Sequence, residues 1–345
     1  MDRRNIVIQA LRFEKPAYVP WSYRLTQRCA QRLAESLSTK ELDDFLAPHI
    51  FDVRSHLRDT EAIDADHVRD RYGVTWDRSV DHDIGSPCDW PIKNRDDLDR
   101  YAFPDANNLC EYEHLPAQLA QHLGRFRRYS LAMCLFERSW SLRGFEDLLA
   151  DMASDAGFVE ALFDRVLEHH LTLLSHVLKL DIDGVHFGDD YGMQTALIMG
   201  PSVWRRLIKP RLSRMFAAAR DAGKFVSLHS CGAVTEILPD LIEIGLDFFN
   251  PFQPEAMDVF ALLRQYRGRL AFHGGLSIQQ TLPRGNVDEV RRESRRLIDA
   301  GKEGGYIFAP SHDVPSDVLP ENLIAMMEVL KGQIEYDRQG ADSDE

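Results

Sequence analysis

The sequence predicts an α/β protein folded as a (β/α)8 barrel of the TIM type, with an N-terminal helical extension and an insertion around residues 60–105. From residue 129 onwards, short apolar segments alternate with helix-patterned segments, which implies parallel strands joined by right-handed crossovers. Six such units and two strands nearer the N-terminus give eight strands, the number in a TIM barrel. An open doubly wound sheet is the alternative, but no Gly-x-Gly-x-x-Gly sequence follows an expected strand.

The first hundred residues alternate less regularly. The expected elements are a short helix over 1–15, a strand over Tyr18–Arg24, a helix over Gln27–Leu46 and a strand over Pro48–Arg54. Pro20 suits a strand start or an edge strand. Residues 60–105 are polar, and a structureless loop of that length would be unusual. We therefore expect an excursion packed on the core, with a small hairpin near Gly73.

The remaining strands and helices follow one another in a regular order. Strands are expected at Tyr129–Phe136, Gly184–Phe187, Lys224–Leu228, Asp247–Asn250, Arg269–Phe272 and Tyr306–Ala309. Helices are expected at Phe145–Ala153, Phe158–Leu180, Pro201–Ala222, Val234–Ile244, Met257–Gln265 and Val287–Ala300. Several of these helices stop at a Gly. We expect residues 1–333 to form a single barrel domain and residues 334–345 to be a frayed polar tail.

Composition narrows the class of partner. The net charge of −14 argues against a nucleic-acid partner, although it says little about a small-molecule substrate. No run approaches the ~18 apolar residues that a membrane span requires. The five cysteines are scattered and odd in number, so we expect no disulfide framework and a cytoplasmic location. The oligomeric state is left open, with a homodimer as one candidate.

Titratable and metal-binding side chains follow the expected strands at their carboxyl ends, where barrel enzymes carry their chemistry. Of these, His229 and Cys231 sit where one strand gives way to a loop, and His312 follows the last strand. Imidazole and thiolate are ligands that zinc prefers, and three protein ligands leave a fourth position open for catalysis. The sequence therefore predicts a catalytic zinc site. An inert buried Cys and a His that bonds a loop are the plainer alternatives.

The other groups at these strand ends are assigned to catalysis or to substrate binding. Asp189, Asp190 and Glu137 are candidates for a fourth ligand, a partner that orients a ligand, or a base. The two aspartates could instead cap a helix, and Glu137 could pair with Arg138 at the surface. The candidates for substrate binding are Tyr191, Gln194, Asn250, Gln253, His273 and Arg24. His273-Gly-Gly could also be a tight turn in which only the glycines matter.

Several motifs resemble those of the uroporphyrinogen decarboxylase superfamily, from about residue 129 to 332. They are His229-Ser-Cys231-Gly232, Leu238-Pro-Asp-Leu-Ile-Glu-Ile-Gly245, Asn250-Pro-Phe-Gln253, Phe272-His-Gly-Gly275, Gly304-Gly-Tyr-Ile-Phe-Ala-Pro-Ser-His312, Asp317-Val-Leu-Pro-Glu-Asn322 and Asp189-Asp-Tyr-Gly-Met-Gln194. The resemblance implies a TIM-type barrel. The resemblance is strong over this range and weak before it.

Two branches of this superfamily imply different chemistry. The methylcobamide:coenzyme M methyltransferases carry a His-x-Cys pair and a later Cys as zinc ligands, and their zinc activates a thiol that takes a methyl group from a corrinoid. His229 and Cys231 match the pair, whereas His312 stands in place of the later Cys. The decarboxylases need no metal and use N-terminal arginines around an Asp, a pattern that Arg24 and Arg28 match only in spacing.

The resemblance favours a zinc-dependent methyl-transfer enzyme that works with cobalamin, or another corrinoid, carried by a partner protein. The alternatives are a metal-independent porphyrinogen decarboxylase and a non-catalytic protein that binds a corrinoid or tetrapyrrole. Loss of activity on addition of a chelator would distinguish the zinc-dependent methyltransferase from the metal-independent decarboxylase. Tight corrinoid binding without methyl exchange would identify the third.

Overall fold

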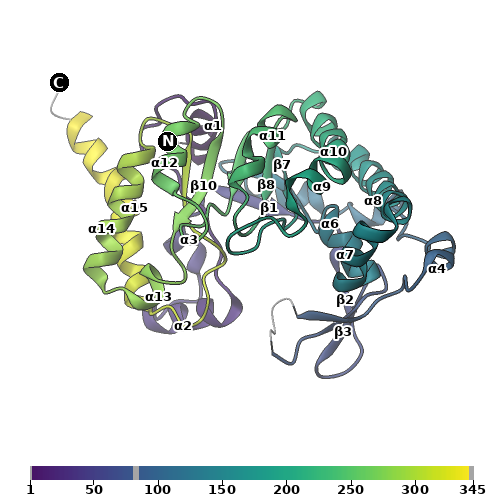
Figure 1. The fold of residues 1–345 in the computed structure, drawn as a ribbon. Helices are drawn as coiled ribbons and strands as arrows, with labels where there is room; N and C mark the ends of the chain where they lie inside the picture. The colour runs from purple at the N-terminus through teal and green to yellow at the C-terminus, as the bar shows by residue number, and fades with distance from the viewer. Residues whose placement is uncertain (1, 81–84, 342–345) are drawn as a thin grey trace.

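A curled sheet of seven parallel strands forms the centre of the molecule (Figure 1), in a computed structural model that describes residues 2–80 and 85–341. The sheet order is β1-β6-β7-β8-β9-β10-β11, so the strands of this sheet lie side by side in the order in which they occur along the chain. The strands are β1 Ile50–Val53, β6 Phe126–Ala132, β7 Gly184–Gly188, β8 Phe225–His229, β9 Phe248–Asn250, β10 Ala271–Leu276 and β11 Tyr306–Pro310. The predicted parallel α/β architecture is therefore confirmed.

The eighth strand, predicted at Tyr18–Arg24, is not formed. Trp21 makes only an isolated parallel bridge to Phe308, through hydrogen bonds from Phe308 N to Pro20 O (2.8 Å) and from Ser22 N to Phe308 O (3.2 Å). Pro20 has no N–H to donate, which shortens any ladder through this segment. The curled sheet thus has a β1 edge without a regular neighbouring strand, and a full eight-stranded barrel is not confirmed.

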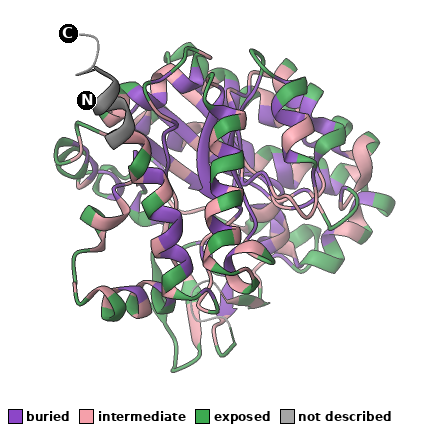
Figure 2. Cartoon of the chain, turned by 90° about the vertical axis from the view of Figure 1, so that its left-hand side faces the viewer, coloured by how far each residue is buried: buried purple, intermediate pink, exposed green. Residues whose placement is uncertain are grey.

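The helices cover the outside of the sheet, with buried residues facing the strands and exposed residues facing outwards (Figure 2). They are α1 Arg3–Leu11, α2 Gln27–Leu37, α3 Leu42–Leu46, α4 Arg95–Arg100, α5 Leu115–Ala120, α6 Phe136–Arg143, α7 Phe145–Ser154, α8 Ala156–Val177, α9 Gly200–Leu207, α10 Lys209–Asp221, α11 Leu238–Glu243, α12 Val259–Gln265, α13 Thr281–Arg284, α14 Val287–Gly301 and α15 Pro320–Ala341. No helix in 2–80 or 85–341 is long and apolar enough to cross a membrane. The last helix runs past residue 333, and residues 342–345 lie outside the described part, so the predicted tail boundary stays a prediction.

Three predicted elements have different limits for identifiable reasons. The helix predicted over Gln27–Leu46 is two helices, because Ser38 caps the first one in the left-handed conformation (φ 52°). The helix predicted over Pro201–Ala222 is interrupted before Pro210. Strand β6 begins three residues earlier than predicted because two charged residues that look like a loop, Arg127 and Arg128, are buried within it. It also ends at Ala132 rather than at Phe136, which begins α6.

The excursion predicted over 60–105 folds as a small antiparallel sheet. Its order is β2-β3-β4-β5, with bounds Thr60–Ala62, His67–Asp70, Thr75–Asp77 and Ser86–Asp89. The turn before Thr75 contains Gly73 at φ 83°, which confirms a hairpin at that point. Buried Tyr72 donates or accepts a hydrogen bond at 2.9 Å with His169 on α8, so the small sheet is fastened to the main body.

Buried His49 fixes the irregular segment against β1, and its charge state should matter for stability. Its Nδ1 donates to Trp21 O (2.9 Å) and its Nε2 accepts from the Tyr18 hydroxyl (3.1 Å). Burial, with a smaller effect of Arg3, lowers the pKa of His49 to about 3. A histidine in the unfolded chain has a pKa of ~6.5. The unfolded chain therefore takes up a proton first as the pH falls.

We expect the free energy of unfolding to decrease by up to a few kcal/mol on this account as the pH falls from 6.5 towards 3. The change to make is His49→Gln, which removes the titrating group. Urea unfolding between pH 7 and pH 4.5 should show a smaller pH slope in this variant than in the wild type. His67→Gln, on the exposed small sheet, is the control and should not flatten the slope. An unchanged slope in His49→Gln would contradict the assignment.

Candidate metal centre

Two tight loops bring the candidate ligands into place at the carboxyl ends of β7 and β8. Gly232 has φ 82°, and a Cβ built there would lie 2.4 Å from the carbonyl carbon of Gly192. The loops are joined by hydrogen bonds from Gly192 N to Cys231 O (3.2 Å) and from Ala233 N to Met193 O (2.8 Å). Glycine is therefore required at both positions for the backbones to approach this closely. This contact fixes the direction in which Cys231 leaves the strand.

The structure brings His229, Cys231 and His312 together. One donor atom from each residue lies within 4.8 Å of the others. The Cys231 Sγ is 3.3 Å from His229 Nε2, and the rings of His229 and His312 are 5.3 Å apart between centroids. His229 is the last residue of β8, while His312 comes from the loop after β11. Three residues that are up to 83 positions apart in sequence thus converge on one point.

The hydrogen bonds of His229 leave the nitrogen nearest Cys231 free to bind a cation. Asn250 Oδ1 lies 2.7 Å from His229 Nδ1, and Asn250 Nδ2 donates to the carbonyl of His273 (3.0 Å). The amide orientation makes Nδ1 the protonated nitrogen, so Nε2 carries the lone pair. An imidazole held in this way is typical of metal sites. The 3.3 Å separation of sulfur and nitrogen is also close to the roughly 3.5 Å that tetrahedral zinc would impose on these ligands.

The electrostatic surroundings suit a divalent cation. Burial and His229 lower the pKa of His312, so this imidazole is neutral at pH 7 and able to act as a ligand. Burial and Asp190 raise the pKa of the Cys231 thiol far above its usual range. The thiol therefore keeps its proton until a cation displaces it. The donor set, one sulfur and two imidazoles, fits zinc better than magnesium or calcium.

Two carboxyl groups lie beside this cluster. Asp190 Oδ1 accepts a hydrogen bond from Cys231 N (2.8 Å) and is 3.6 Å from His229 Nε2. Burial, together with Asp190 and Asp189, raises the pKa of Glu137 well above its usual range. Two carboxyl groups next to three metal-competent donors can hold and move a proton near the site.

The residues of this site lie within a segment that matches a known protein family. The uroporphyrinogen decarboxylase (URO-D) family model matches residues 128–333, which is more than half of the chain. The chain belongs to this family. A uroporphyrinogen decarboxylase of Geobacillus thermodenitrificans is 24% identical over 94% of this chain and 96% of its own length. One of Thermus thermophilus is 26% identical over 50% of this chain and 49% of its own.

A methyltransferase from Methanosarcina mazei is a solved structure similar to this one, with a TM-score of 0.75. The alignment covers 97% of this chain and 99% of that protein at 14% identity. At this identity the similarity concerns the fold alone. The family model thus confirms the family that the motifs indicate, and the structural match concerns the fold; the named relatives and the structural neighbour carry different activities in their names.

In this URO-D family protein, Asp189 and Tyr191 are buried and hold neighbouring backbone in place rather than lining the site. Both side chains are fully buried. The Asp189 carboxylate accepts hydrogen bonds from Phe136 N (2.8 Å), Glu137 N (2.6 Å) and the Tyr191 hydroxyl (2.8 Å). The first two bonds satisfy N–H groups at the start of α6, which precedes Asp189 in the chain, whereas the alternative drawn from the sequence was a cap on the helix that follows. Substrate contact and base catalysis, the roles expected for Tyr191 and Asp189, are not favoured by these positions.

Replacing Asp189 with Asn should therefore cost stability more than metal binding. The amide would turn an N–H₂ group towards donors that need an acceptor, at an expected cost of about 2–3 kcal/mol in the free energy of unfolding. Urea unfolding gives this number, and zinc per folded chain is measured on the same sample. Asp190→Asn, which faces the cluster, is the matched variant and should destabilise less. Loss of zinc from folded Asp189→Asn would instead place Asp189 among the ligands.

The other residues predicted to bind substrate are spread over the mouth with different partners. Gln253 Oε1 accepts from Gly232 N (2.6 Å), so Gln253 supports the ligand loop, as Asn250 does. Buried His273 bonds the carbonyl of Ser22 (2.7 Å) through Nε2. Gln194 is exposed and donates to Glu255 O (3.2 Å). Arg24 pairs with Asp313, the neighbour of His312, at 3.0 Å. Arg28, which follows Arg24 by four residues in the sequence, is exposed on α2.

Sequence reasoning missed a polar group inside the sheet. Arg128 on β6 bonds both oxygens of Asp52 on β1 (2.7 and 2.9 Å), and His186 on β7 bonds Ser227 on β8 (2.8 Å) through Nδ1. Barrel interiors are ordinarily filled with branched apolar side chains. Alternation along the strands, with polar residues at Arg128 and Ser130 and at Ser227 and His229, was the available signal.

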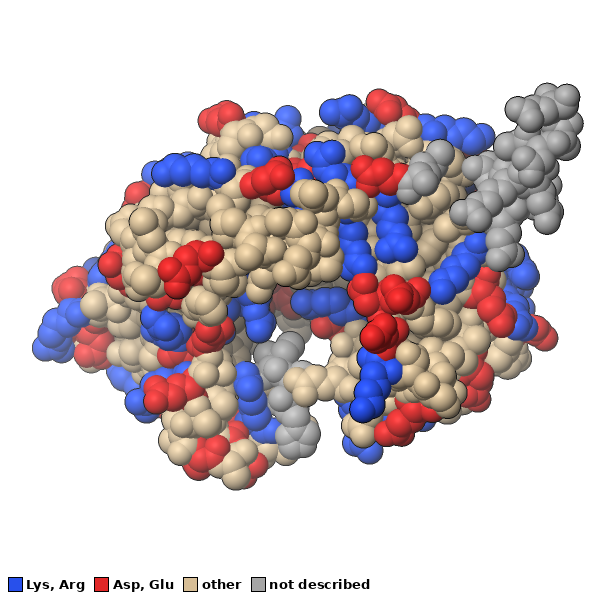
Figure 3. Space-filling model, turned by 180° about the vertical axis from the view of Figure 1, so that it is seen from behind, with Lys and Arg blue, Asp and Glu red and all other residues tan. Residues whose placement is uncertain are grey.

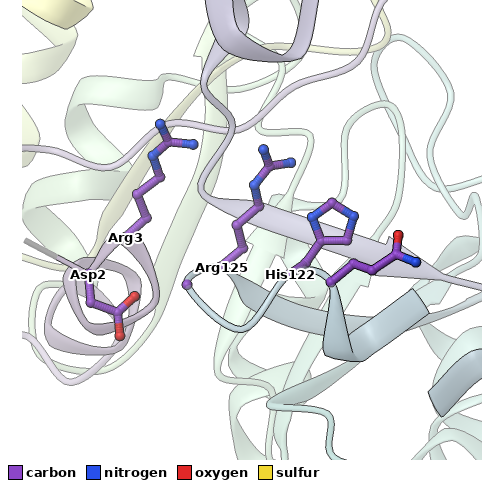
Figure 4. A pocket seen from close by; sticks show the side chains of 6 residues that line it. Asp2, Arg3, His122 and Arg125 are labelled. Carbon is purple, nitrogen blue, oxygen red and sulfur yellow. The ribbon is translucent and has the colours of Figure 1, made fainter. Parts of the chain in front are cut away.

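A small cavity at the opposite ends of the strands stands apart from the donor cluster. It measures about 420 Å³ and is lined by Asp2, Arg3, Gln121, His122, Gly124 and Arg125 (Figure 4). These residues come from the start of α1 and the turn before β6. Because barrel chemistry occupies the carboxyl ends of the strands, we assign it no part in the reaction.

Proposed function

We propose that this URO-D family protein is a zinc-dependent methyltransferase. It would take a methyl group from a methylated corrinoid on a partner protein and give it to a small thiol. The observation that carries the proposal is the convergence of His229, Cys231 and His312 within 4.8 Å at the carboxyl ends of the strands. A metal held by three protein ligands leaves a fourth position for a substrate atom. The methyltransferase fold match supports the same branch.

The chain's own residues would divide the work in a simple way. His229, Cys231 and His312 would hold the zinc, and Asn250 fixes the ring of His229. Bound zinc would lower the pKa of a substrate thiol so that the thiolate predominates near neutral pH. Asp190 is placed to accept the thiol proton. In the proposed transfer the thiolate would form the S–C bond as the Co–C bond breaks, and the corrinoid would keep both electrons of the broken bond.

The test uses zinc-loaded protein with free methylcobalamin in place of the partner protein. Absorbance should report loss of the methyl–cobalt bond that depends on added 2-mercaptoethanol, and mass spectrometry should find the methyl thioether. A chelator should stop the reaction and zinc should restore it. Full turnover in the chelated, metal-free protein would overturn the proposal.

A porphyrinogen decarboxylase is the second candidate, and one observation favours it. The curated relatives that span this chain carry that name. Against it, Arg24 is paired with Asp313 and Arg28 is exposed on α2. Release of CO₂ from uroporphyrinogen, measured with and without chelator, decides between the candidates. Chelator-resistant decarboxylation would favour this second reading.

A further inference from the structure

The two histidines of the donor cluster are held in place by different means. His229 is oriented through its side chain, because Asn250 Oδ1 lies 2.7 Å from its Nδ1. The ring of His312 has no hydrogen-bond partner among the described residues, and it meets the ring of His229 at 5.3 Å between centroids. Metal-binding imidazoles ordinarily have a partner that fixes the ring. The position of His312 must therefore depend on the backbone that carries it.

The backbone before His312 is fixed to the sheet. Ser311 follows the last residue of β11 and is fully buried. Its N–H donates to the carbonyl of Leu276 at the end of β10 (2.7 Å), where the pairing of the two strands ends at Leu276 and Pro310. This anchor fixes the point at which the chain leaves the sheet, but it leaves the direction of the following residues open.

The backbone after His312 is fixed to the N-terminal part of the chain. Val314 N donates to the carbonyl of Arg24 (3.0 Å). The carbonyl of Val314 accepts from both the N–H and the hydroxyl of Thr26 (3.1 Å each). The backbone bonds form the isolated parallel bridge between Leu25 and Val314, and the Val314 side chain is fully buried. His312 is thus anchored on both sides.

An ion pair links the same two segments, but it constrains the loop less. Arg24 donates from Nε and Nη2 to the two oxygens of Asp313 (3.1 and 3.0 Å). The Arg24 side chain is 70% exposed, and exposed ion pairs hold their partners weakly in water. Basic and acidic side chains stand close together over much of the surface seen from behind (Figure 3). The hydrogen bonds to Val314 are therefore the stronger constraint on the loop.

We propose that the segment Arg24–Thr26 is a positioning element for the metal centre and sets the place of His312 through Val314. The inference rests on the proposed function, because it requires the three donors to bind zinc. The family model matches residues 128–333, so it covers His312 but not this segment. The N-terminal segment therefore contributes to the site without supplying a ligand. This gives Arg24 a role other than the predicted contact with substrate.

The test changes Thr26, where graded substitutions remove the anchor in steps. Thr26→Ser keeps both hydrogen bonds to Val314, Thr26→Val loses the bond from the hydroxyl, and Thr26→Pro loses both. Proline fits this position, since Thr26 has φ −61° and its side chain makes no capping bond to α2. Competition with a chromogenic chelator measures the zinc affinity of each variant.

Zinc affinity is expected to fall about tenfold in Thr26→Pro, because a loosened loop must be ordered again before His312 can bind the metal. Thr26→Ser should match the wild type, and Thr26→Val should lie between the two. Cobalt(II) in place of zinc gives a second readout. Its visible absorption bands should coincide in wild type and Thr26→Ser and should shift in Thr26→Pro, because they report the arrangement of the ligands.

A double-variant cycle shows whether the effect passes through His312. In the His312→Ala background, Thr26→Pro should leave the remaining zinc affinity unchanged, because the ligand that the segment positions is already absent. An equal loss in both backgrounds would show a general disturbance of the fold and would overturn the proposal. Wild-type affinity in Thr26→Pro would overturn it as well. Circular dichroism and urea unfolding establish that each variant is folded.

The outcomes separate this inference from the proposed function. Zinc binding that responds to Thr26→Pro as expected, in a protein that transfers no methyl group, would end the proposed function and support the positioning role. Methyl transfer by a zinc-loaded protein whose affinity ignores Thr26→Pro would do the reverse. Absence of zinc binding by the wild type would overturn both.

Discussion

Purified Cys231→Ala protein is expected to contain almost no zinc, where the wild type contains about one zinc per chain. The thiolate is the strongest donor of the three ligands, and losing it leaves two imidazoles on a single open face. We expect zinc affinity to fall by several kcal/mol, about a thousandfold or more. The fold should survive, because Cys231 lies on a loop at the rim and its truncation leaves no cavity in the core. Elemental analysis after zinc supplementation and gel filtration gives the result.

The matched control is Cys88→Ala, which removes an exposed cysteine far from the donor cluster in sequence and should leave the zinc content unchanged. Cys134 is less suitable, because it is fully buried near Asp189 and its loss would disturb the support of the site. Zinc content that stays at the wild-type level in Cys231→Ala would end the zinc hypothesis in its present form. Zinc in neither protein would shift attention to metal-free chemistry.

How far the sequence could predict this molecule depended on whether each feature was local. Strands such as β7 and β11 were found within one residue, because an apolar run between helices is a local pattern. The missing strand at Tyr18–Arg24 could not be foreseen, since an apolar run with one Pro is compatible with a strand or with a bridged coil. Its neighbours from distant parts of the chain, among them Phe308, His49 and Val314, decide the matter.

Some features of the candidate site could likewise be predicted from the sequence, and others could not. The three donors could be grouped from sequence because each follows a strand, and the carboxyl ends of parallel strands meet. The difference between Asp189 and Asp190 could not be foreseen. Adjacent residues at a strand end point in opposite directions, so Asp189 turns inwards to cap α6 while Asp190 turns towards Cys231. The pairing of Asp52 with Arg128 was hidden as well, because charged residues in a strand resemble a loop.

Replacing His312 is the second change with a large expected effect. His312→Ala should weaken zinc binding by several kcal/mol, since only His229 and Cys231 would remain as ligands from the predicted set. His312→Cys places at this position the residue that the corrinoid-dependent branch is expected to carry, and it should bind zinc more tightly than His312→Ala. Competition with a chromogenic chelator at pH 7.5 measures both constants. His67→Ala, on the small antiparallel sheet, is the control for loss of a histidine.

An unchanged zinc affinity in His312→Ala would move the third ligand to Asp190. The geometry leaves few other choices among the carboxyl and imidazole groups that the sequence proposed. Asp189 is saturated by three hydrogen bonds, and His273 is buried against the carbonyl of Ser22. Asp190 already lies 3.6 Å from His229 Nε2 and could turn onto the metal. Zinc loss in the double variant His312→Ala/Asp190→Asn, but in neither single variant, would establish that substitution of ligands.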